Sequence, residues 1–203
     1  MRCLPVLFAT TIAAASSFAA AFTPGDLVVV QYGDGSAALS SGATAAFLNE
    51  FGVGGGSALQ TIALPTATSG GNRAFTVSGS ANSEGFIKLS TDGQYLTLGG
   101  YDAALGTLAV ASTAPATVNR VVALVSANGS IDTSTALNNV SGNLRAVASD
   151  NGTRFWTSSS LVGFGYVRLD EYTHRRYTTW LRLAGVGVAT SAIAGWWWIF
   201  FQA

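Results

Sequence analysis

Short runs of apolar and β-branched residues alternate with turn-forming residues from residue 22 to about residue 160. Typical runs are DLVVVQY, RAFTVSG, YLTLGG and RVVALVSA. Runs of this length, bounded by Gly, Asn, Asp and Ser, are typical of β-strands. Only SGATAAFLNEFG, residues 41–52, also fits an amphipathic helix. We predict a strand at 45–51 there because its neighbours are all strands, so the whole region is predicted to be all-β.

Four Asx-Gly pairs separate these runs. An Asx-Gly pair accommodates the positive φ values of a two-residue hairpin turn, which makes it a strong local signal for a hairpin. The pattern therefore predicts antiparallel sheet. The pairs are Asp34-Gly35, Asp92-Gly93, Asn128-Gly129 and Asn151-Gly152.

One phrase of the sequence occurs twice. The first copy begins NRAFTVSG at Asn72 and continues through GFIKLSTDGQYLT, and the second begins NRVVALVSA at Asn119 and continues through NLRAVASDNGTRFWT. The copies are 47 residues apart at their start and 59 at their last turn, so the second is longer between its first two strands. The matching positions are Asn72 with Asn119, Arg73 with Arg120, Ser90 with Ser149, Gly93 with Gly152, Tyr95 with Phe155, and Thr97 with Thr157.

A repeat of roughly 40 to 60 residues with three or four strands is typical of a β-propeller blade. Tyr95, Phe155 and Trp156 are then predicted to be core or blade-interface residues, and 22–66 an earlier, less regular unit. A propeller needs about four blades to close, and 22–160 is too short for three such repeats. We therefore predict an incomplete propeller with bare sheet faces, which assembles with other chains or belongs to something longer.

The segments that carry these patterns resemble the N-terminal part of a family of secreted bacterial β-propeller-like repeat proteins, which are largely uncharacterised. They are FTPGDLVVVQYGDGSAAL, QTIALPT, SGGNRAFTVSGSANSEGFIKLSTDGQYLTLGGYDA, TVNRVVALVSANGSIDTSTAL and RAVASDNGTRFWTSS. The resemblance covers most of 22–160 and implies a propeller that continues into further blades. Some members of the family carry a C-terminal sorting anchor. No catalytic residues are carried over from the family to this chain.

The first 21 residues have the layout of a secretory signal peptide. Arg2 precedes an apolar run from residue 4 to about residue 15, and Ala19 and Ala21 form a small-x-small cleavage site before Phe22. The chain is therefore expected to be secreted or displayed on the extracellular surface. Cys3 is the only cysteine, so the mature chain is expected to lack disulfides and cysteine metal ligands.

The composition changes abruptly after residue 160, and we treat 161–203 as an atypical tail. It contains four of the five tryptophans and the only histidine, His174. Three interpretations remain open. The uncharged run 183–201 is close to the roughly 20 residues that span a bilayer, although the arginines before it reverse the positive-inside rule. The tail also fits a last strand pair, or a segment translated in a shifted reading frame.

Composition and charge narrow the classes of function. Only 10% of the residues are charged, against roughly 25% in ordinary globular proteins, and the formal net charge is zero. This lacks the basic surface that phosphate backbones require, so we expect no nucleic-acid partner. No nucleotide-binding or nucleophile-elbow motif occurs, and FGVGGGSAL at residue 51 is predicted to be a loop.

The acidic residues are the remaining candidates for chemistry, because a glycosidase needs only two carboxyl groups across a cleft. Asp34, Asp92 and Asp150 lie in or beside turns. Glu50, Glu84 and Asp102 are the acids least explained by turns. We nevertheless predict no catalytic, cofactor-binding or metal site. The expectation is an exported, non-catalytic, propeller-type binding or structural module that contacts extracellular carbohydrate or protein. The alternatives are a secreted glycosidase-like enzyme, a surface protein anchored through the tail, and a non-functional fragment.

Overall fold

The computed structural model describes residues 19–161 and 163–168. These residues form twelve strands and one short 3-10 helix, which confirms the all-β prediction. The predicted signal peptide up to residue 18 and the tail beyond residue 168, including His174 and the run 183–201, lie outside the described residues. The elements are β1 (Leu27–Tyr32), β2 (Ala43–Phe51), β3 (Gln60–Ala63), β4 (Thr76–Ser78), β5 (Lys88–Leu89), β6 (Tyr95–Tyr101), η1 (Val110–Ser112), β7 (Arg120–Ser126), β8 (Ile131–Asp132), β9 (Ala136–Leu137), β10 (Leu144–Ser149), β11 (Arg154–Ser159) and β12 (Gly163–Arg168).

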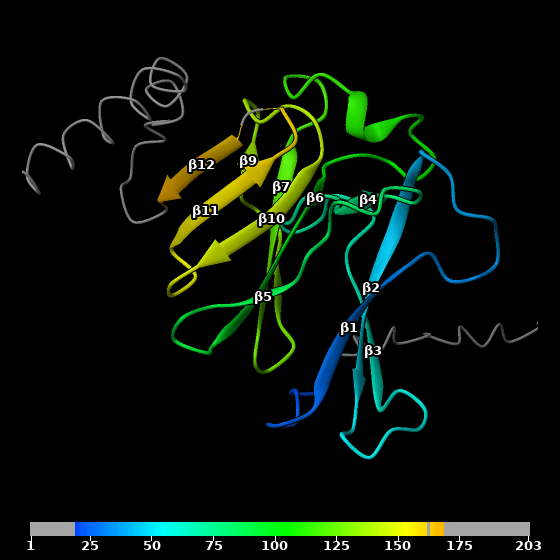
Figure 1. Cartoon of the computed structure of the whole chain (residues 1–203), viewed down its shortest axis with the longest axis vertical. Helices are drawn as coiled ribbons and strands as arrows, with labels where there is room; N and C mark the ends of the chain where they lie inside the picture. Colours follow the sequence, from blue (N-terminus) through cyan, green and yellow to red (C-terminus); the bar gives the residue numbers. More distant parts are fainter. Residues whose placement is uncertain (1–18, 162, 169–203) are drawn as a thin grey trace, which may run out of the picture.

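The strands form three groups that lie side by side (Figure 1). Layer one consists of β1–β4, layer two of β5–β9 and layer three of β10–β12. All strand pairs are antiparallel. Layers one and two belong to one hydrogen-bonded sheet, but only β4 joins them: it pairs with β2 over three residues and with β6 through the single pair Thr76 and Tyr101. Away from β4 the two layers separate and face each other across a core.

Layer two is the middle layer, and its strand β7 shows this in its burial. Val121, Ala123 and Val125 pack in the core that layer two shares with layer one. Val122, between them, packs in the core shared with layer three. Successive side chains of a strand point to opposite faces, so this strand supplies both cores. That explains why VVALV, within the strand sequence RVVALVS, is an uninterrupted apolar run rather than an alternating one.

Two adjacent glycines in β6 allow the neighbouring layers to approach closely. A Cβ atom on Gly99 would lie 2.5 Å from Leu144 of layer three, and one on Gly100 would lie 2.6 Å from Phe75, next to β4 of layer one. Both distances are shorter than van der Waals contact, so larger residues here would push the layers apart. The Gly99-Gly100 pair therefore sets the spacing on both sides of the middle layer.

Each layer begins with a strand, an Asx-Gly turn and a second strand. The turns at Gly35, Gly93 and Gly152 are 58 and 59 residues apart and connect β1 to β2, β5 to β6 and β10 to β11. The structural repeat therefore has three members: the two copies of the repeated phrase and, before them, a member that begins in the less regular unit predicted at 22–66. The prediction that 22–160 is too short for three repeats is wrong. The third member also continues past residue 160, because β12 pairs with β11 from Gly163 to Arg168.

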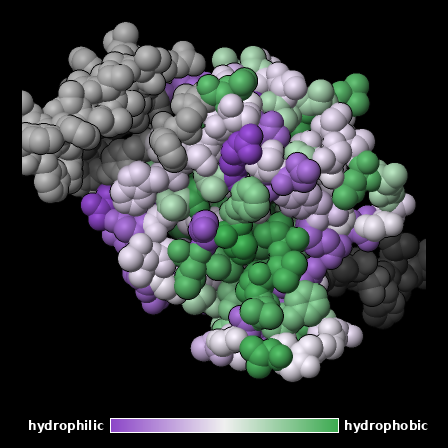
Figure 2. Space-filling model, in the orientation of Figure 1, coloured by the Kyte–Doolittle hydropathy of each residue, from purple (hydrophilic) through white to green (hydrophobic). Residues whose placement is uncertain are grey.

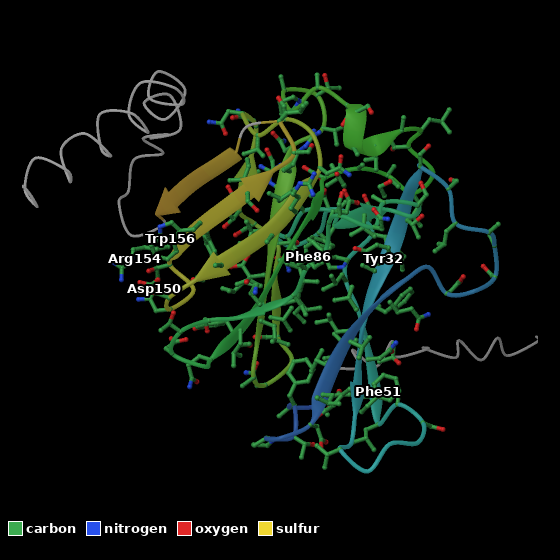
Figure 3. All side chains as sticks on the ribbon, in the orientation of Figure 1. Tyr32, Phe51, Phe86, Asp150, Arg154 and Trp156 are labelled. Carbon is green, nitrogen blue, oxygen red and sulfur yellow. The ribbon has the colours of Figure 1, made fainter. Side chains whose placement is uncertain are left out.

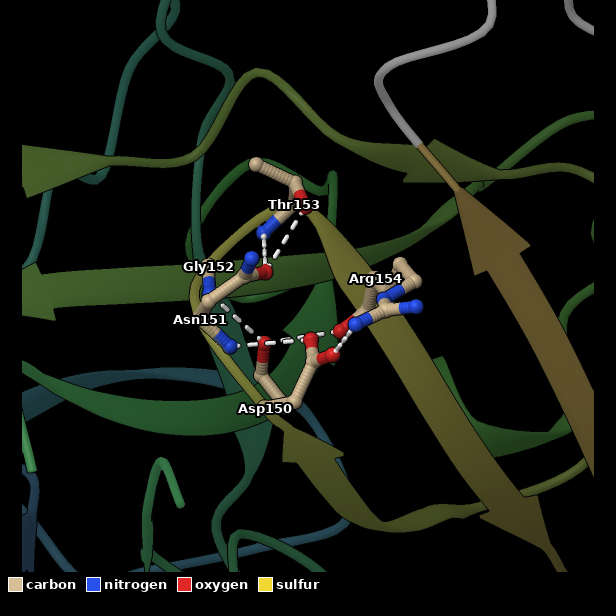
Figure 4. A network of polar contacts seen from close by, with 6 residues as sticks. Asp150, Asn151, Gly152, Thr153 and Arg154 are labelled. Atoms are coloured by element: carbon tan, nitrogen blue, oxygen red, sulfur yellow. Dashed lines mark hydrogen bonds and ion pairs between the residues drawn. The ribbon is translucent and has the colours of Figure 1, made fainter. Parts of the chain in front are cut away.

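The turns themselves differ from the two-residue hairpins that the sequence predicts. In each Asx-Gly pair only the glycine has a positive φ, and Ala109 is the sole non-glycine with one in the described part of the chain. Instead of adopting the left-handed conformation, the Asx side chain accepts a hydrogen bond from the N–H two residues on, as Asn151 does from Thr153 at 3.1 Å (Figure 4). Asp34, Asp92 and Asn128 do the same. The loops are consequently longer, and each needs one glycine.

The prediction for 45–51 is confirmed, since these residues lie within β2. The glycine-rich segment after it is the β2–β3 loop, as predicted. Phe155 is 1% exposed and belongs to the core between layers two and three. Trp156, its neighbour, lies on the opposite face of β11 and is 44% exposed. The incomplete propeller stays a prediction.

Candidate functional site

Glu84 lies at the centre of a buried polar network. Its Oε1 accepts a hydrogen bond from the backbone N–H of Ser78 at 2.6 Å, and its Oε2 accepts from the Tyr101 hydroxyl at 2.5 Å and from the Asn143 amide at 3.1 Å. The Tyr32 hydroxyl donates to the Glu84 carbonyl oxygen at 2.8 Å. These partners come from all three layers or the loops beside them, so the carboxylate connects the layers.

The electrostatics of this network follow from its burial. Desolvation raises the pKa of Glu84 above its ordinary value, although hydrogen bonds from Tyr101, Ser78 and Asn143 and the charge of Arg120 oppose the shift. Burial and the nearby Glu84 raise the pKa of Tyr32 to about 12. Burial and Glu84 also raise the pKa of Tyr101. A hydroxyl with a raised pKa stays protonated and serves as a donor to the carboxylate.

Arg120 is fully buried and binds backbone carbonyl groups. Its guanidinium lies 5.0 Å from the centre of the Tyr101 ring. Burial lowers its pKa, while Tyr101 and Glu84 oppose the shift; the group remains a cation, as arginine does in proteins. Its N–H groups donate to the carbonyl oxygens of Gly142 at 3.0 and 3.1 Å, Ala111 at 2.9 Å, Thr113 at 3.0 Å and Val118 at 2.9 Å. Arg120 therefore fixes the loops at one end of layers two and three.

The other two candidate acids also have partners. The Glu50 carboxylate accepts hydrogen bonds from the Thr23 N–H at 2.5 Å and the Gln60 side chain at 2.6 Å. Burial alone would raise the pKa of Glu50, but these hydrogen bonds together lower it. Asp102 forms an ion pair with Arg73 at 2.9 Å. Each acid is thus explained by a structural contact.

The structure does not bring these acids together in one site. Glu50 is opposite Val28 near the start of β1, whereas Glu84 contacts Tyr32 at the end of that strand. These two positions of β1 are four residues, or roughly 13 Å, apart, and the two carboxylates share no hydrogen-bond donor. Among residues 19–161 and 163–168, no group of three or more His, Cys, Asp or Glu side chains could hold a metal ion.

The outer face of layer one is open and partly apolar, and we call it the first end face. Leu27 and Val29 of β1 are 59% and 50% exposed, while Val28 and Val30 point into the core. Beside them, the Asn49 amide donates to Gln31 at 2.7 Å and accepts from the Thr61 hydroxyl at 2.6 Å. The polar groups are therefore already paired with each other. The first end face consists of Leu27, Val29, Gln31, Phe47, Asn49, Phe51 and Thr61.

The outer face of layer three is the second end face, to which β10 and β11 contribute Ala146, Ala148, Arg154, Trp156 and Ser158. Cross-strand pairing places Ala148 opposite Trp156 and Ala146 opposite Ser158, on the side away from the core residues Val147 and Phe155. Figure 3 shows Trp156 on the side of the molecule opposite Phe51 of layer one. The two end faces therefore lie at opposite ends of the stack of layers.

A third apolar surface lies between β1 and β5. Figure 2 shows apolar residues gathered in the middle of this view, where layers one and two meet the solvent. Phe86 is 51% exposed, and Val28, Val30 and Ile87 are partly buried against the core. These residues extend the core between the layers to the surface.

Sequence reasoning missed the residues that organise these sites. Tyr101, Asn143 and Ser78 carry no motif, and the run LVVVQY gives no sign that alternate residues face outward. The matched pair Arg73 and Arg120 was the one sequence feature that included a residue of the buried network, namely Arg120. Comparison of the chain with protein-family models, curated proteins and solved structures finds no match in any of the three. In the described part of the chain, no helix has the length and hydrophobicity to cross a membrane.

Proposed function

We propose that the chain is an exported, non-catalytic module of propeller type whose two end faces are its contact surfaces for protein or carbohydrate. The observation that carries the proposal is that the candidate acidic residues are already bound within the protein, whereas apolar side chains of an end face are exposed. The carboxylates of Glu50, Glu84 and Asp102 are bound by the protein's own donors. Apolar side chains of the first end face, in contrast, are half exposed.

The packing of layers two and three supports the propeller-type arrangement. Residues 86–92 run parallel to 145–150: Phe86 forms a parallel bridge with Ala146, and the N–H groups of Thr91 and Asp92 donate to the carbonyl oxygens of Ser149 and Asp150 at 3.1 and 3.0 Å. The first strands of the two layers therefore lie next to each other and point the same way. Each layer then continues as an antiparallel meander, as a propeller blade does.

The test is an assay for turnover. The purified chain is incubated with a panel of glycosidic substrates, and the proposal expects no hydrolysis above the blank. Glu84→Gln and Glu50→Gln are the informative variants, because an enzyme built on either acid would lose its activity. Asp132→Asn is the control, since this exposed residue only accepts a hydrogen bond from the Ser134 N–H. Hydrolysis that Glu84→Gln or Glu50→Gln removes and Asp132→Asn retains would contradict the proposal.

A further inference from the structure

The residues that follow the predicted cleavage site are held between layers one and two. The Phe22 side chain packs against the core that these layers share, and its N–H donates to the carbonyl oxygen of Ala127 at 2.9 Å. The next N–H along the chain, that of Thr23, donates to Glu50 Oε1 at 2.5 Å. Residue 22 is therefore positioned by its own contacts and by those of the residue after it, which do not involve the predicted signal peptide.

Glu50 is a water-excluded carboxylate that forms no ion pair within the described residues. It is 2% exposed, and its hydrogen-bond donors are an uncharged backbone N–H and an uncharged amide. The ion pairs within residues 19–161 and 163–168 hold Asp102 and Asp150 instead. A buried charge is costly unless it is paired, so a cation beside Glu50 would stabilise the fold.

The Glu50 carboxylate lies close to the predicted cleavage site. The Gln60 amide nitrogen donates to Glu50 Oε2 at 2.6 Å, and the same nitrogen lies 3.3 and 3.5 Å from the carbonyl oxygens of Ala20 and Ala21. The Ala21 carbonyl belongs to the peptide bond that cleavage before Phe22 breaks. Glu50 and this peptide bond thus share one amide group as their neighbour.

A second acid lies at the same end of layer one. A Cβ atom on Gly52, two residues after Glu50, would lie 4.0 Å from Asp26 Oδ1. The Asp26 N–H donates to the Thr23 carbonyl oxygen at 3.1 Å, so Asp26 belongs to the turn that directly follows Phe22. The chain at residue 22 therefore has two carboxylates near it.

We infer that Glu50 is the binding site for the α-ammonium group that removal of the signal peptide creates at Phe22. Hydrolysis of the Ala21–Phe22 bond consumes one water: a carboxylate leaves with Ala21, and Phe22 keeps an amine that is largely protonated at neutral pH. The ammonium group has three N–H donors, so it can keep its bond to the Ala127 carbonyl and also bind Glu50. The inference rests on the export proposed above and names the residue that receives the processed end of the chain.

This ion pair exists only in the processed chain. In the precursor, the Phe22 nitrogen is an uncharged peptide nitrogen, and its single hydrogen is bonded to Ala127. After cleavage the same atom carries a positive charge one residue, or about 3.8 Å of chain, before Thr23, whose N–H is bonded to Glu50. Removal of the signal peptide thus supplies a cation to this carboxylate and fixes the new N-terminus between the two layers.

The experiment starts from the full chain, expressed with residues 1–21 in a bacterial host and purified after export. Mass spectrometry of the N-terminal peptide identifies its first residue. The rate at which acetic anhydride acetylates the α-amine is then measured across pH; because only the uncharged amine reacts, the midpoint gives its pKa. A neighbouring carboxylate favours the charged form, so we expect Phe22 as the first residue, with a pKa above the ordinary range of α-amino groups.

Three variants identify the carboxylate that is responsible. Glu50→Gln removes the charge but keeps an oxygen for the Thr23 N–H, and at pH 7 its α-amine should react about tenfold faster than in the wild type, equal to one unit of pKa. Glu50→Asp keeps the charge and should retain a raised pKa. Asp34→Asn is the matched control: it removes a negative charge at the other end of β1, where exposed Asp34 accepts hydrogen bonds from Ser36, and it should leave the amine unchanged.

An ordinary pKa of the wild-type α-amine would overturn the inference, whether or not the variants fold. So would a raised pKa that Glu50→Gln leaves unchanged, or one that Asp34→Asn lowers equally. None of these results contradicts the proposed function. A purified chain that begins elsewhere than at Phe22 also overturns the inference, and only a chain that keeps the signal peptide contradicts export as well.

Discussion

Replacement of Arg120 tests how the loops around layers two and three are held. Arg120→Met keeps a long apolar side chain but removes the donors from four backbone carbonyl groups, those of Gly142, Ala111, Thr113 and Val118. Hydrogen bonds to charged groups contribute about 1.5–3 kcal/mol each, which gives roughly 6–12 kcal/mol for four. Burying the Arg120 cation itself costs free energy, so its removal offsets several kcal/mol of this lost hydrogen-bond energy. We expect a net loss of about 3–5 kcal/mol in unfolding free energy, comparable with the loss on breaking a buried ion pair.

Arg73→Met is the matched control, because the sequence repeat places Arg73 at the position of Arg120. The Arg73 side chain is 39% exposed, and its main contact is the ion pair with Asp102. Exposed ion pairs contribute about 0–1 kcal/mol, so this variant should unfold almost like the wild type. Urea unfolding followed by circular dichroism gives both values.

The reasoning is refuted if Arg120→Met costs no more than Arg73→Met. Because a domain of this size has about 5–15 kcal/mol of stability in total, Arg120→Met could leave too little folded protein to measure. Arg120→Lys then provides the comparison. It keeps the charge but loses the planar fork of donors, and it should still be clearly less stable than Arg73→Lys.

Four further variants test the layers, the buried acids and one strained residue. Gly99→Ala should cost about 1–3 kcal/mol in urea unfolding, because its Cβ would overlap Leu144; an unchanged midpoint would show that the layers can separate freely. Glu84 has a raised pKa in the fold, so its stabilising contribution is present below the unfolded value and lost as pH rises through the folded one. Glu84→Gln should therefore gain stability relative to wild type as pH rises from about 4. For Glu50 the pKa is lowered, so wild-type stability is lost as pH falls and Glu50→Gln should show the opposite trend; equal trends would contradict the assignment. Ala109→Gly should stabilise by about 0.5–1 kcal/mol, since exposed Ala109 has a φ of 47°, and a loss in thermal midpoint would argue against strain there.

The strands and their turns could be predicted because their signals are local. Asx-Gly pairs and β-branched runs act within a few residues, so they identified the hairpins and also favoured a strand over a helix at 45–51. The burial of Arg120 and the exposure of Arg73 could not be predicted in the same way. Both arginines follow an asparagine and precede an apolar run, and only the position of each strand in the stack distinguishes them.

The face to which the residues after an Asx-Gly turn point depends on the length of the turn. A difference of one residue explains why residues matched in the sequence repeat lie on different faces of their layers. Ser90 is opposite Tyr95 across a loop of residues 91–94, whereas Ser149 is opposite Phe155 across the longer loop 150–154. One extra residue reverses the face to which every following side chain points. Tyr95 consequently lies against Gly152 of the next layer, while Phe155, its match in sequence, packs against the preceding layer. Trp156 of β11 consequently lies on the second end face. The loop length at 150–154 thus determines which side chains of β11 belong to that face.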